Sequence, residues 1–351
     1  MKKIYKTKQV KVKNTLIGGD APVTIQSMTN THTRNYEATI EQVRRLEAVG
    51  CDIVRLAVVD LDEVKVACRI AKEVAVPLVA DIQYDYKLAV ASADGGMAKI
   101  RINPGNLGGA DKLREVSTAC KRNGVPIRVG VNAGSLEKGI STAGGIAKAL
   151  AYSGLRNLKL LEDCGFDDLV VSVKASSAKV TVGAYRMLAK KCDYPLHIGI
   201  TESGVGLSGI IKSSVGLGAL LLDGLGDTVR VSLSGDPVDE IDIARRLLRA
   251  SGRDTNFCEV ISCPTCGRCS FDVAGLAEKV ETRTRNIKAP LKIAVMGCVV
   301  NGVGEGKHAD LGIAGGKDKA VIFYKGEVIK TVEMENAEEE FFKFVEASLR
   351  I

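Results

Sequence analysis

Tryptophan is absent from this chain of 351 residues, and phenylalanine and tyrosine are scarce, with 7 and 8 residues. Few aromatic rings argue against single-stranded nucleic-acid binding, in which bases stack on such rings. No stretch approaches the roughly 18–20 consecutive apolar residues of a membrane span. The first ten residues carry charge but no apolar signal-peptide segment. We therefore expect a cytoplasmic protein that contacts neither membrane nor nucleic acid.

Glycine is plentiful, with 37 residues, and the apolar content of 46% is ordinary for a globular protein with a sizeable core. This composition predicts an α/β protein with many short turns between strands and helices. The net charge of +7 is spread along the chain without long runs. It is compatible with an anionic small molecule, an acidic protein or nucleic acid, so charge alone does not identify a ligand.

Short strand-like runs, most of them rich in Val, Ile and Leu, alternate with helix-like stretches through the first two thirds of the chain. The expected strands are residues 23–29, 52–58, 77–83, 99–105, 126–132, 168–175, 195–202 and 228–234. The expected helices include residues 37–49, 61–74, 111–123 and 237–250. Eight β–α units in about 250 residues predict a TIM barrel. A doubly wound open sheet is the alternative, but it usually has fewer strands and often a glycine-rich turn after the first.

The pattern changes after residues 251–254, where a small α+β domain is expected. Its predicted strands are residues 257–261, 291–296, 311–314, 320–324 and 327–332, followed by a closing helix at 338–349. We therefore divide the chain into a substrate-binding TIM barrel at residues 1–252 and a cysteine-containing domain at residues 253–351.

Polar side chains follow or end most of the expected barrel strands, where barrel enzymes place their active sites. They are Arg55, Arg101, Asn103, Arg128, Asn132, Ser135, Ser172, Lys174, Thr201, Glu202, Arg230, Ser232 and Ser234. Five are cations in otherwise apolar strands, and a buried charge without a partner is costly. Because guanidinium groups bind phosphate in a bidentate manner, the pattern predicts a phosphate or diphosphate pocket. Internal ion pairs with Asp81, Asp85 or Glu202 are a compatible alternative.

Ten cysteines in an expected cytoplasmic protein favour metal or redox use over disulfides. Five are scattered among apolar or helical patterns and are expected to be small buried residues: Cys51, Cys68, Cys120, Cys164 and Cys192. Another three form the run Cys263-Pro-Thr-Cys266-Gly-Arg-Cys269, and Cys298 lies some thirty residues on. This spacing fits either a zinc site with all four thiolates or an iron–sulfur cluster, which it favours slightly. Cys258 adds a further candidate ligand.

A series of motifs in order along nearly the whole chain carries a family resemblance. They are SMTNTHTRN, DIVRLAV, LVADIQYDY, RINPGN, RVGVNAGSLEKG, SVKAS, LHIGITESG, CPTCGRC and GCVVNGVGE. Together they resemble the two-domain form of the bacterial 4-hydroxy-3-methylbut-2-enyl diphosphate synthase family, from the methylerythritol phosphate pathway of isoprenoid synthesis. The resemblance implies a TIM barrel joined to a domain with a 4Fe-4S cluster. It also implies reductive ring opening and dehydroxylation of 2-C-methyl-D-erythritol 2,4-cyclodiphosphate, with two electrons from ferredoxin or flavodoxin.

The resemblance also implies roles for particular residues. The cluster ligands would be Cys263, Cys266, Cys298 and Glu305, which leaves Cys269 as a bystander. A carboxylate is a harder and more easily displaced ligand than a thiolate. Substrate contacts would come from residues at the expected strand ends: Arg55, Arg101, Asn103, Arg128, Asn132, Ser135, Lys174, Thr201, Arg230 and Ser232. Glu202 would be the acid or base for the departing hydroxyl, which Asn301 would orient.

A head-to-tail homodimer is implied too, in which the cluster domain of one subunit caps the barrel of the other. Two positions depart from the family pattern: Val303 stands where proline is common, and Gln83 where histidine is common. Two other functions remain open on the residues alone. One is a zinc-stabilised nucleic-acid-binding protein, and the other is a barrel transferase of the pterin-binding kind with a structural metal domain.

Overall fold

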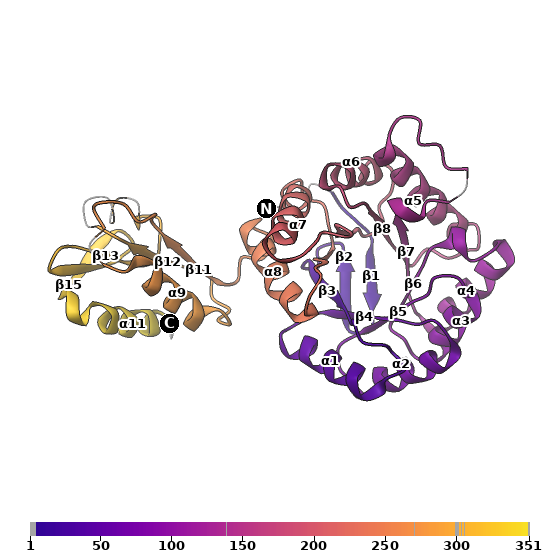
Figure 1. Ribbon diagram of the computed structural model, residues 1–351, viewed down its shortest axis with the longest axis horizontal. Helices are drawn as coiled ribbons and strands as arrows, with labels where there is room; N and C mark the ends of the chain where they lie inside the picture. The colour runs from indigo at the N-terminus through magenta and orange to yellow at the C-terminus, as the bar shows by residue number, and fades with distance from the viewer. Residues whose placement is uncertain are drawn as a thin grey trace. The chain divides into compact units, whose positions relative to one another are not determined.

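The computed structural model describes residues 5–137, 139–269, 271–298, 302, 304 and 306–349. The chain divides into two compact units, Met1–Asp254 and Thr255–Ile351. Figure 1 shows both units.

The first unit is a TIM barrel, as predicted. Its strands in the described part of the chain are β3 (Thr24–Met28), β4 (Ile53–Ala57), β5 (Leu78–Asp81), β6 (Lys99–Ile102), β7 (Ile127–Asn132), β8 (Leu169–Lys174), β9 (His197–Gly199) and β10 (Thr228–Arg230). They pair in the order β8-β7-β6-β5-β4-β3-β10-β9, and every pairing is parallel. A bridge between Val171 and Leu196 closes the ring. Each predicted barrel strand contains one of these observed strands.

The barrel helices lie outside the ring of strands (Figure 1). They are α1 (Tyr36–Ala48), α2 (Leu61–Glu73), α3 (Tyr86–Asp94), α4 (Ala110–Asn123), α5 (Ile146–Glu162), α6 (Ala178–Ala189), α7 (Gly206–Leu222) and α8 (Pro237–Ala250). Several begin at a side chain that accepts a backbone N–H of the first turn, as Asp60 does for α2 and Asp236 for α8. Such caps fix where these β–α loops end, and the β–α loops form the rim of the barrel.

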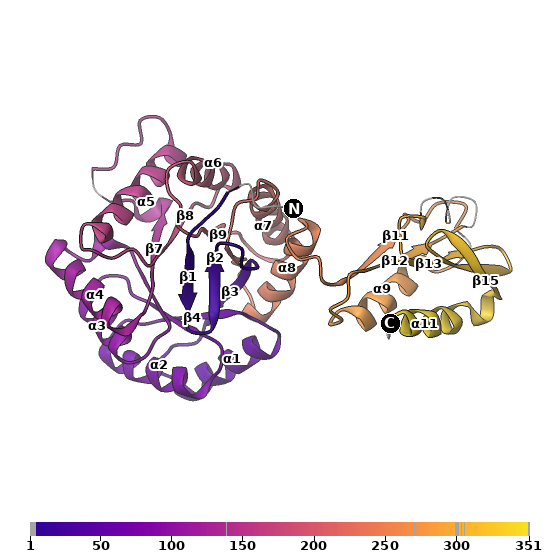
Figure 2. The same ribbon diagram turned by 180° about the vertical axis from the view of Figure 1, so that it is seen from behind.

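A hairpin precedes the barrel strands and was not expected from the sequence. It pairs β1 (Gln9–Val12) with β2 (Thr15–Gly18). Its apolar residues Val10, Val12 and Ile17 pack with Ile53 and Val79, which lie near the beginnings of β4 and β5. Figure 2 shows the hairpin lying across the barrel. The amino end of the barrel is therefore covered by apolar side chains, while the carboxyl end carries the polar ones.

The second unit is a small α+β domain. Its elements are β11 (Cys258–Ser262), α9 (Val273–Thr284), β12 (Leu291–Met296), β13 (Leu311–Gly315), β14 (Lys319–Tyr324), β15 (Glu327–Glu333) and α11 (Ala337–Ser348). The sheet order is β11-β12-β13-β14-β15, with the first three strands parallel and the last two pairings antiparallel. The strands and the closing helix lie where the sequence predicted them, whereas α9 was not predicted.

The scattered cysteines behave largely as predicted. Cys51, Cys68 and Cys120 are buried in the barrel core, and Cys164 and Cys192 are partly buried against it. The described part of the chain contains no helix with the length and apolar content needed to cross a membrane.

Candidate active site

A polar pocket opens among the carboxyl ends of the barrel strands. Residues from seven of the eight strands, or from just beyond their ends, line it. They are Arg55, Asp81, Gln83, Arg101, Arg128, Asn132, Ser172, Lys174, Thr201, Arg230 and Ser232. The five cations that the sequence predicted to converge are thus brought together around one cavity.

Glycines on neighbouring strands make room for two of these cations. A Cβ atom at Gly130 of β7 would lie 2.5 Å from Nε of Arg101. A Cβ atom at Gly199 of β9 would collide with Nζ of Lys174. Alternate strand residues share a face, so these glycines occupy inward positions where another side chain would push a cation aside. The strand sequences therefore provide both the cations and the space they occupy.

Asp81 at the end of β5 is the carboxylate that lies among the pocket cations. Its Oδ1 accepts from Nη1 of Arg101 at 2.9 Å, and its Oδ2 lies 3.6 Å from Nε of Arg55. Burial alone would raise the pKa of Asp81, yet the guanidiniums of Arg55, Arg101 and Arg128 together hold this pKa below its usual range. Asp81 therefore stays ionised and orients two arginines, which agrees with the predicted internal ion pairing at this residue.

Burial works against the charged forms of the other cations. It lowers the pKa of Arg55 to about 9. It also lowers the pKa values of Arg128 and Lys174 well below their usual ranges, and neighbouring cations add to this effect. Arg128 is 1% exposed, and Nη1 donates to the Ser172 hydroxyl at 3.3 Å. A bound anion would offset this mutual repulsion, because it adds the counter-charge that the barrel lacks.

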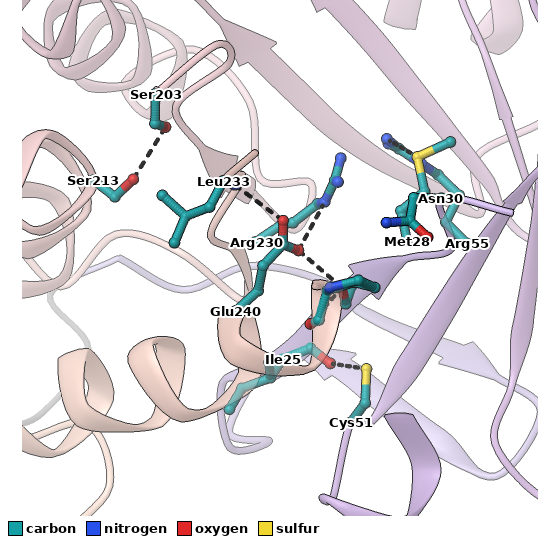
Figure 3. Close-up of polar contacts among 12 residues, drawn as sticks. Ile25, Met28, Asn30, Cys51, Arg55, Ser203, Ser213, Arg230, Leu233 and Glu240 are labelled. Atoms are coloured by element: carbon teal, nitrogen blue, oxygen red, sulfur yellow. Dashed lines mark hydrogen bonds and ion pairs between the residues drawn. The ribbon is translucent and has the colours of Figure 1, made fainter. Parts of the chain in front are cut away.

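Figure 3 shows the contacts of the two arginines on β4 and β10. The Arg55 guanidinium donates to the thioether sulfur of Met28, at 3.1 Å from Nε and 2.8 Å from Nη2. Arg230 lies beside the buried carboxylate of Glu240, with Nε 3.7 Å from Oε2. Neither contact fully neutralises its arginine. The Met28 thioether carries no charge, and the ion pair between Arg230 and Glu240 is long.

The pocket thus holds a marked excess of positive charge. Its five lining cations face two nearby carboxylates, Asp81 and Glu240, which leaves a formal excess of three. Asn132, Thr201 and Ser232 add hydrogen-bonding groups to the wall. Cations, amides and hydroxyls in this arrangement suit a doubly or triply charged phosphate ester that also carries hydroxyl groups.

Several buried polar side chains in the barrel interior do not line the pocket. Lys99, His197 and Gln26 are at most 1% exposed. Within the described part of the chain, the Lys99 amine, both His197 nitrogens and the Gln26 amide have no hydrogen-bond partner. Burial, with Arg128 and Arg55 beside it, lowers the pKa of Lys99 well below its usual range. The barrel therefore carries further uncompensated polar groups besides the pocket cations.

Four of the polar residues predicted for the barrel site do not line the pocket: Asn103, Ser135, Glu202 and the exposed Ser234. Asn103 is buried after β6, and its amide makes no hydrogen bond to a described residue. Ser135 lies exposed in the turn after β7. Glu202 is exposed after β9 and has a backbone φ of 52°, which is unusual for a residue other than glycine. Such strain recurs at functional sites, but the role of Glu202 stays a prediction.

Sequence reasoning missed several residues that shape the site. Met28 and Glu240 hold arginines, and Lys99 is buried in the barrel although it begins its strand. Glu240 gave no separate signal, because acidic residues are common in the first turn of any helix. The alternation of Lys99 with Arg101 on β6 did carry a signal, since residues two apart on a strand share a face.

In the second unit, two cysteine segments leave the same edge of the sheet. Cys263 follows β11 directly and Cys298 follows β12 by two residues, and these strands are parallel neighbours with Ser262 opposite Val295. The backbone N–H of Gly297 donates to Sγ of Cys263 at 3.1 Å. The fold therefore brings the first cysteine of the run next to the residue that precedes Cys298.

The other two cysteines of the run differ from each other. Cys269 is partly buried, and its thiol donates to the carbonyl of Phe271 at 3.0 Å. Cys266 is exposed, and the backbone N–H of Arg268 holds the pKa of its thiol below the usual range. A thiol that donates its proton to a carbonyl is less available as a thiolate ligand than one that accepts N–H groups.

The donor set fits an iron–sulfur cluster in its chemistry. Thiolates are the usual ligands of such clusters, and hydrogen bonds to sulfur tune them; Cys263 and Cys266 both accept backbone N–H groups. Within the described residues, no three His, Cys, Asp or Glu side chains lie close enough to hold a metal ion. The predicted ligand Glu305 and the predicted neighbour Asn301, like Val303, lie outside the described residues.

Comparison with solved structures relates the barrel to dihydropteroate synthases. The enzyme from Yersinia pestis has a TM-score of 0.54 at 12% identity, over 70% of this chain and 100% of its own. The enzyme from Stenotrophomonas maltophilia has a TM-score of 0.51 at 14% identity, over 69% and 98%. At this identity the likeness concerns the fold alone.

Comparison of sequences is more specific. The GcpE TIM-barrel domain model matches residues 7–245, and the model of the GcpE protein C-terminal domain matches residues 259–347. A curated relative from Caldanaerobacter subterraneus subsp. tengcongensis is 52% identical over 98% of both chains. One from Geobacter sulfurreducens is 50% identical over 93% of both. Both are named 4-hydroxy-3-methylbut-2-en-1-yl diphosphate synthase (flavodoxin). The chain belongs to the GcpE family.

Proposed function

We propose that this protein is an iron–sulfur oxidoreductase that converts 2-C-methyl-D-erythritol 2,4-cyclodiphosphate to 4-hydroxy-3-methylbut-2-enyl diphosphate in isoprenoid precursor synthesis. The observation that carries the proposal is the match of both domains to one family, with about half of the residues identical to named synthases. The cationic pocket supports it independently, because it suits a compact, multiply charged phosphate ester.

The reaction makes a specific demand on the pocket. Two electrons and one proton enter, a ring C–O bond to phosphate breaks, and one hydroxyl leaves as water. The open diphosphate then carries one more negative charge than the cyclic substrate. A pocket with a formal excess of three positive charges stabilises this developing charge more strongly than the substrate charge.

In this proposal Arg55, Arg101, Arg128, Lys174 and Arg230 bind the diphosphate, and Asp81 fixes two of these side chains. Asn132, Thr201 and Ser232 complete the pocket wall, and Asn103 and Ser135 remain candidates for contacts nearby. Glu202 would hold the proton for the departing hydroxyl, with Asn301 orienting that hydroxyl. The exposed position and strained backbone of Glu202 at the barrel rim support this role.

The cofactor in the proposal is a 4Fe-4S cluster held by Cys263, Cys266, Cys298 and Glu305. When bound, such a cluster supplies electrons one at a time. The convergence of the Cys263 and Cys298 segments at Gly297 supports two of these ligands. The hydrogen bond from the Cys269 thiol to Phe271 supports its place outside the ligand set.

The proposed partners follow from the relatives and from the chemistry. The relatives' names include flavodoxin, so reduced flavodoxin is the proposed electron donor, with ferredoxin as the alternative. The proposed assembly is a homodimer in which each cluster domain serves the barrel of the other subunit. Among the described residues, no cysteine forms a disulfide, which supports a reducing compartment such as the cytoplasm.

Anaerobic purification and reconstitution with iron and sulfide test the proposal. We expect a brown protein with four irons per chain that consumes the cyclic diphosphate when supplied with reduced flavodoxin. A colourless protein that binds one zinc per chain and leaves the cyclic diphosphate unchanged would contradict it.

Mixing a barrel-site variant with a cluster-ligand variant tests the dimer. Activity should return in the mixture if each barrel uses the cluster of the other subunit.

A further inference from the structure

Glu240 is a buried carboxylate that the proposed reaction leaves without a role. It lies in the first turn of α8 (Pro237–Ala250) and is 3% exposed. An ionised carboxylate at such a position is costly unless its oxygens are paired. Asp239, one residue earlier in the same turn, is exposed. The turn therefore holds two acids in opposite environments, and only one of them faces the barrel.

Both oxygens of Glu240 have defined partners (Figure 3). Oε1 accepts the backbone N–H of Leu233 at 3.0 Å. Oε2 accepts the hydroxyl of Ser27 at 2.8 Å and lies 3.7 Å from Nε of Arg230. These partners lie on β3, on β10 and in the segment after β10. A single carboxylate thus connects two neighbouring barrel strands to the loop that carries Ser232.

The contact with Arg230 leaves the far end of that side chain available. In Figure 3 the terminal guanidinium nitrogens point away from Glu240, while Nε faces it. Arg230 also lines the anion pocket. Nε of Arg230 makes no hydrogen bond to a described residue, so its charged contact is the 3.7 Å ion pair with Glu240. Because guanidinium is planar, this ion pair favours one plane in which Nη1 and Nη2 meet an anion. The hydrogen bond from the backbone N–H of Leu233 to Oε1 of Glu240 fixes the neighbouring pocket wall at the same time.

The charge of Glu240 depends on the same contacts. Burial raises the pKa of this carboxyl, while Arg230, the Leu233 N–H and the Ser27 hydroxyl oppose the rise. The ionised Glu240 carboxylate and the Arg230 guanidinium therefore stabilise each other's charged form. Removal of the carboxylate would leave Arg230 without its charged partner and free to turn about its outer torsions.

We propose that Glu240 is a positioning residue of the anion pocket, which orients Arg230 and the Ser232–Leu233 backbone for diphosphate binding without touching the diphosphate itself. The inference rests on the proposed function only in the identity of the ligand as a diphosphate. It predicts that, among the pocket cations, the carboxylate acts chiefly through Arg230, with which it forms an ion pair.

Calorimetric titration of the full chain with inorganic diphosphate tests the proposal. Glu240→Gln preserves the size of the side chain, and we expect it to weaken diphosphate binding about tenfold. Asp239→Asn is the matched control, because it removes the same charge from the same helical turn but has no contact with Arg230. We expect that control to change binding less than about twofold. Steady-state turnover of the cyclic diphosphate should show a raised KM for Glu240→Gln with kcat within about twofold.

A double-mutant cycle separates positioning from general destabilisation. In an Arg230→Gln background, the further change Glu240→Gln should weaken binding less than about twofold. If Glu240→Gln weakens binding tenfold in both backgrounds, or in neither, Glu240 does not act through Arg230 and the proposal is wrong. Unfolding temperatures of all variants show whether each is folded when it is titrated.

Failure of the proposed function would give a different binding result from failure of the positioning role alone. If the unaltered protein binds no inorganic diphosphate and no cyclic diphosphate, the anion pocket itself is misassigned. If it binds both, and Glu240→Gln binds them equally well, only the positioning role is overturned.

Discussion

The two units of this protein carry their chemistry on different kinds of structure. In the barrel, the pocket cations project from the strands themselves, which are paired on both sides and buried. In the small domain, the candidate cluster ligands Cys263, Cys266, Cys269 and Cys298 lie in segments that follow strands, and Cys266 is exposed. The first site is therefore fixed by sheet geometry, whereas the second depends on loops. Rigid strands can hold like charges together that would otherwise move apart.

This difference has consequences for stability. The barrel keeps five pocket cations and the buried Lys99 close together, so it stores repulsion that an anion can relieve. The loops of the small domain hold no such cluster of charge within the described residues. They hold thiols, whose convergence an iron–sulfur cluster would reinforce. We therefore expect the barrel to be stabilised by its substrate and the small domain by its cofactor.

The largest expected effect concerns the cysteine segments. Cys263→Ser removes a proposed ligand, and we expect it to abolish the iron–sulfur absorbance and lower turnover about 1,000-fold or more, because electrons no longer reach the substrate. Iron analysis and turnover with reduced flavodoxin measure both effects. Cys269→Ser is the matched control and should keep the cluster and about half or more of the activity. The opposite result for the two variants would reverse their assignment.

Glu305 offers a second test of the same ligand set. Glu305→Ala should lower turnover strongly, since the proposed ligand set uses a carboxylate where an all-cysteine site would be closed. An intact and fully active cluster in Glu305→Ala, together with loss of the cluster in Cys269→Ser, would make Cys269 the fourth ligand.

The next-largest expected effect is the selective stabilisation of the barrel by an anion, which distinguishes it from the small domain. Inorganic diphosphate at one hundred times its Kd should stabilise the barrel by about 2.7 kcal/mol. For a domain of this size that corresponds to a rise of about 5–10 °C in the unfolding temperature. Differential scanning calorimetry should show the shift in the barrel transition, with the transition of the small domain unchanged. Equal shifts in both transitions would contradict a pocket built by the barrel alone.

The contrast between cations on strands and cysteines in loops also explains which features the sequence could predict. The barrel strands were predictable because parallel strands buried on both faces are nearly continuous apolar runs, so a cation within one is conspicuous. Arg55, Arg101 and Arg128 were found in this way, and the pocket brings them together. The hairpin β1–β2 was missed because two apolar residues alternating with polar ones over four positions give a weak signal.

Residues that act through tertiary contacts were harder to predict. Glu240 looks like any acid at a helix start, and only the fold brings it to Ser27, more than two hundred residues away. Met28 resembles a core residue until its sulfur is seen to accept from Arg55. The proposed cysteine ligands were predictable from spacing only as a set of candidates, since spacing does not reveal that the Cys269 thiol donates to a carbonyl.

Lys99→Met tests whether the buried cations reduce stability. The amine has no partner among the described residues, so an apolar side chain of similar length should raise the free energy of unfolding by about 1–3 kcal/mol. Chemical denaturation measures this, with the exposed Lys121→Met as a control that should change it by less than about 0.5 kcal/mol. A loss of stability in Lys99→Met would mean that the amine is satisfied inside the barrel.

The gain from Lys99→Met should also depend on pH. The folded barrel lowers the pKa of Lys99 well below the ordinary value of 10.5, so between these two pKa values the unfolded chain binds the additional proton. The stability of the unaltered protein therefore rises with pH across that window. The advantage of Lys99→Met should accordingly be largest at low pH and shrink as the pH approaches 10.5.

The smallest expected effect tests whether strand geometry fixes the pocket cations. Gly130→Ala places a methyl group 2.5 Å from Nε of Arg101, whose flexible end can move aside. We expect the barrel to remain folded but to bind inorganic diphosphate about tenfold more weakly, a loss of about 1.4 kcal/mol. Gly218→Ala on α7 meets no atom within 4 Å and is the matched control, with binding unchanged. Unaltered binding in Gly130→Ala would show that Arg101 reaches the anion from more than one position, so that the pocket of the barrel is as adaptable as the loops of the small domain.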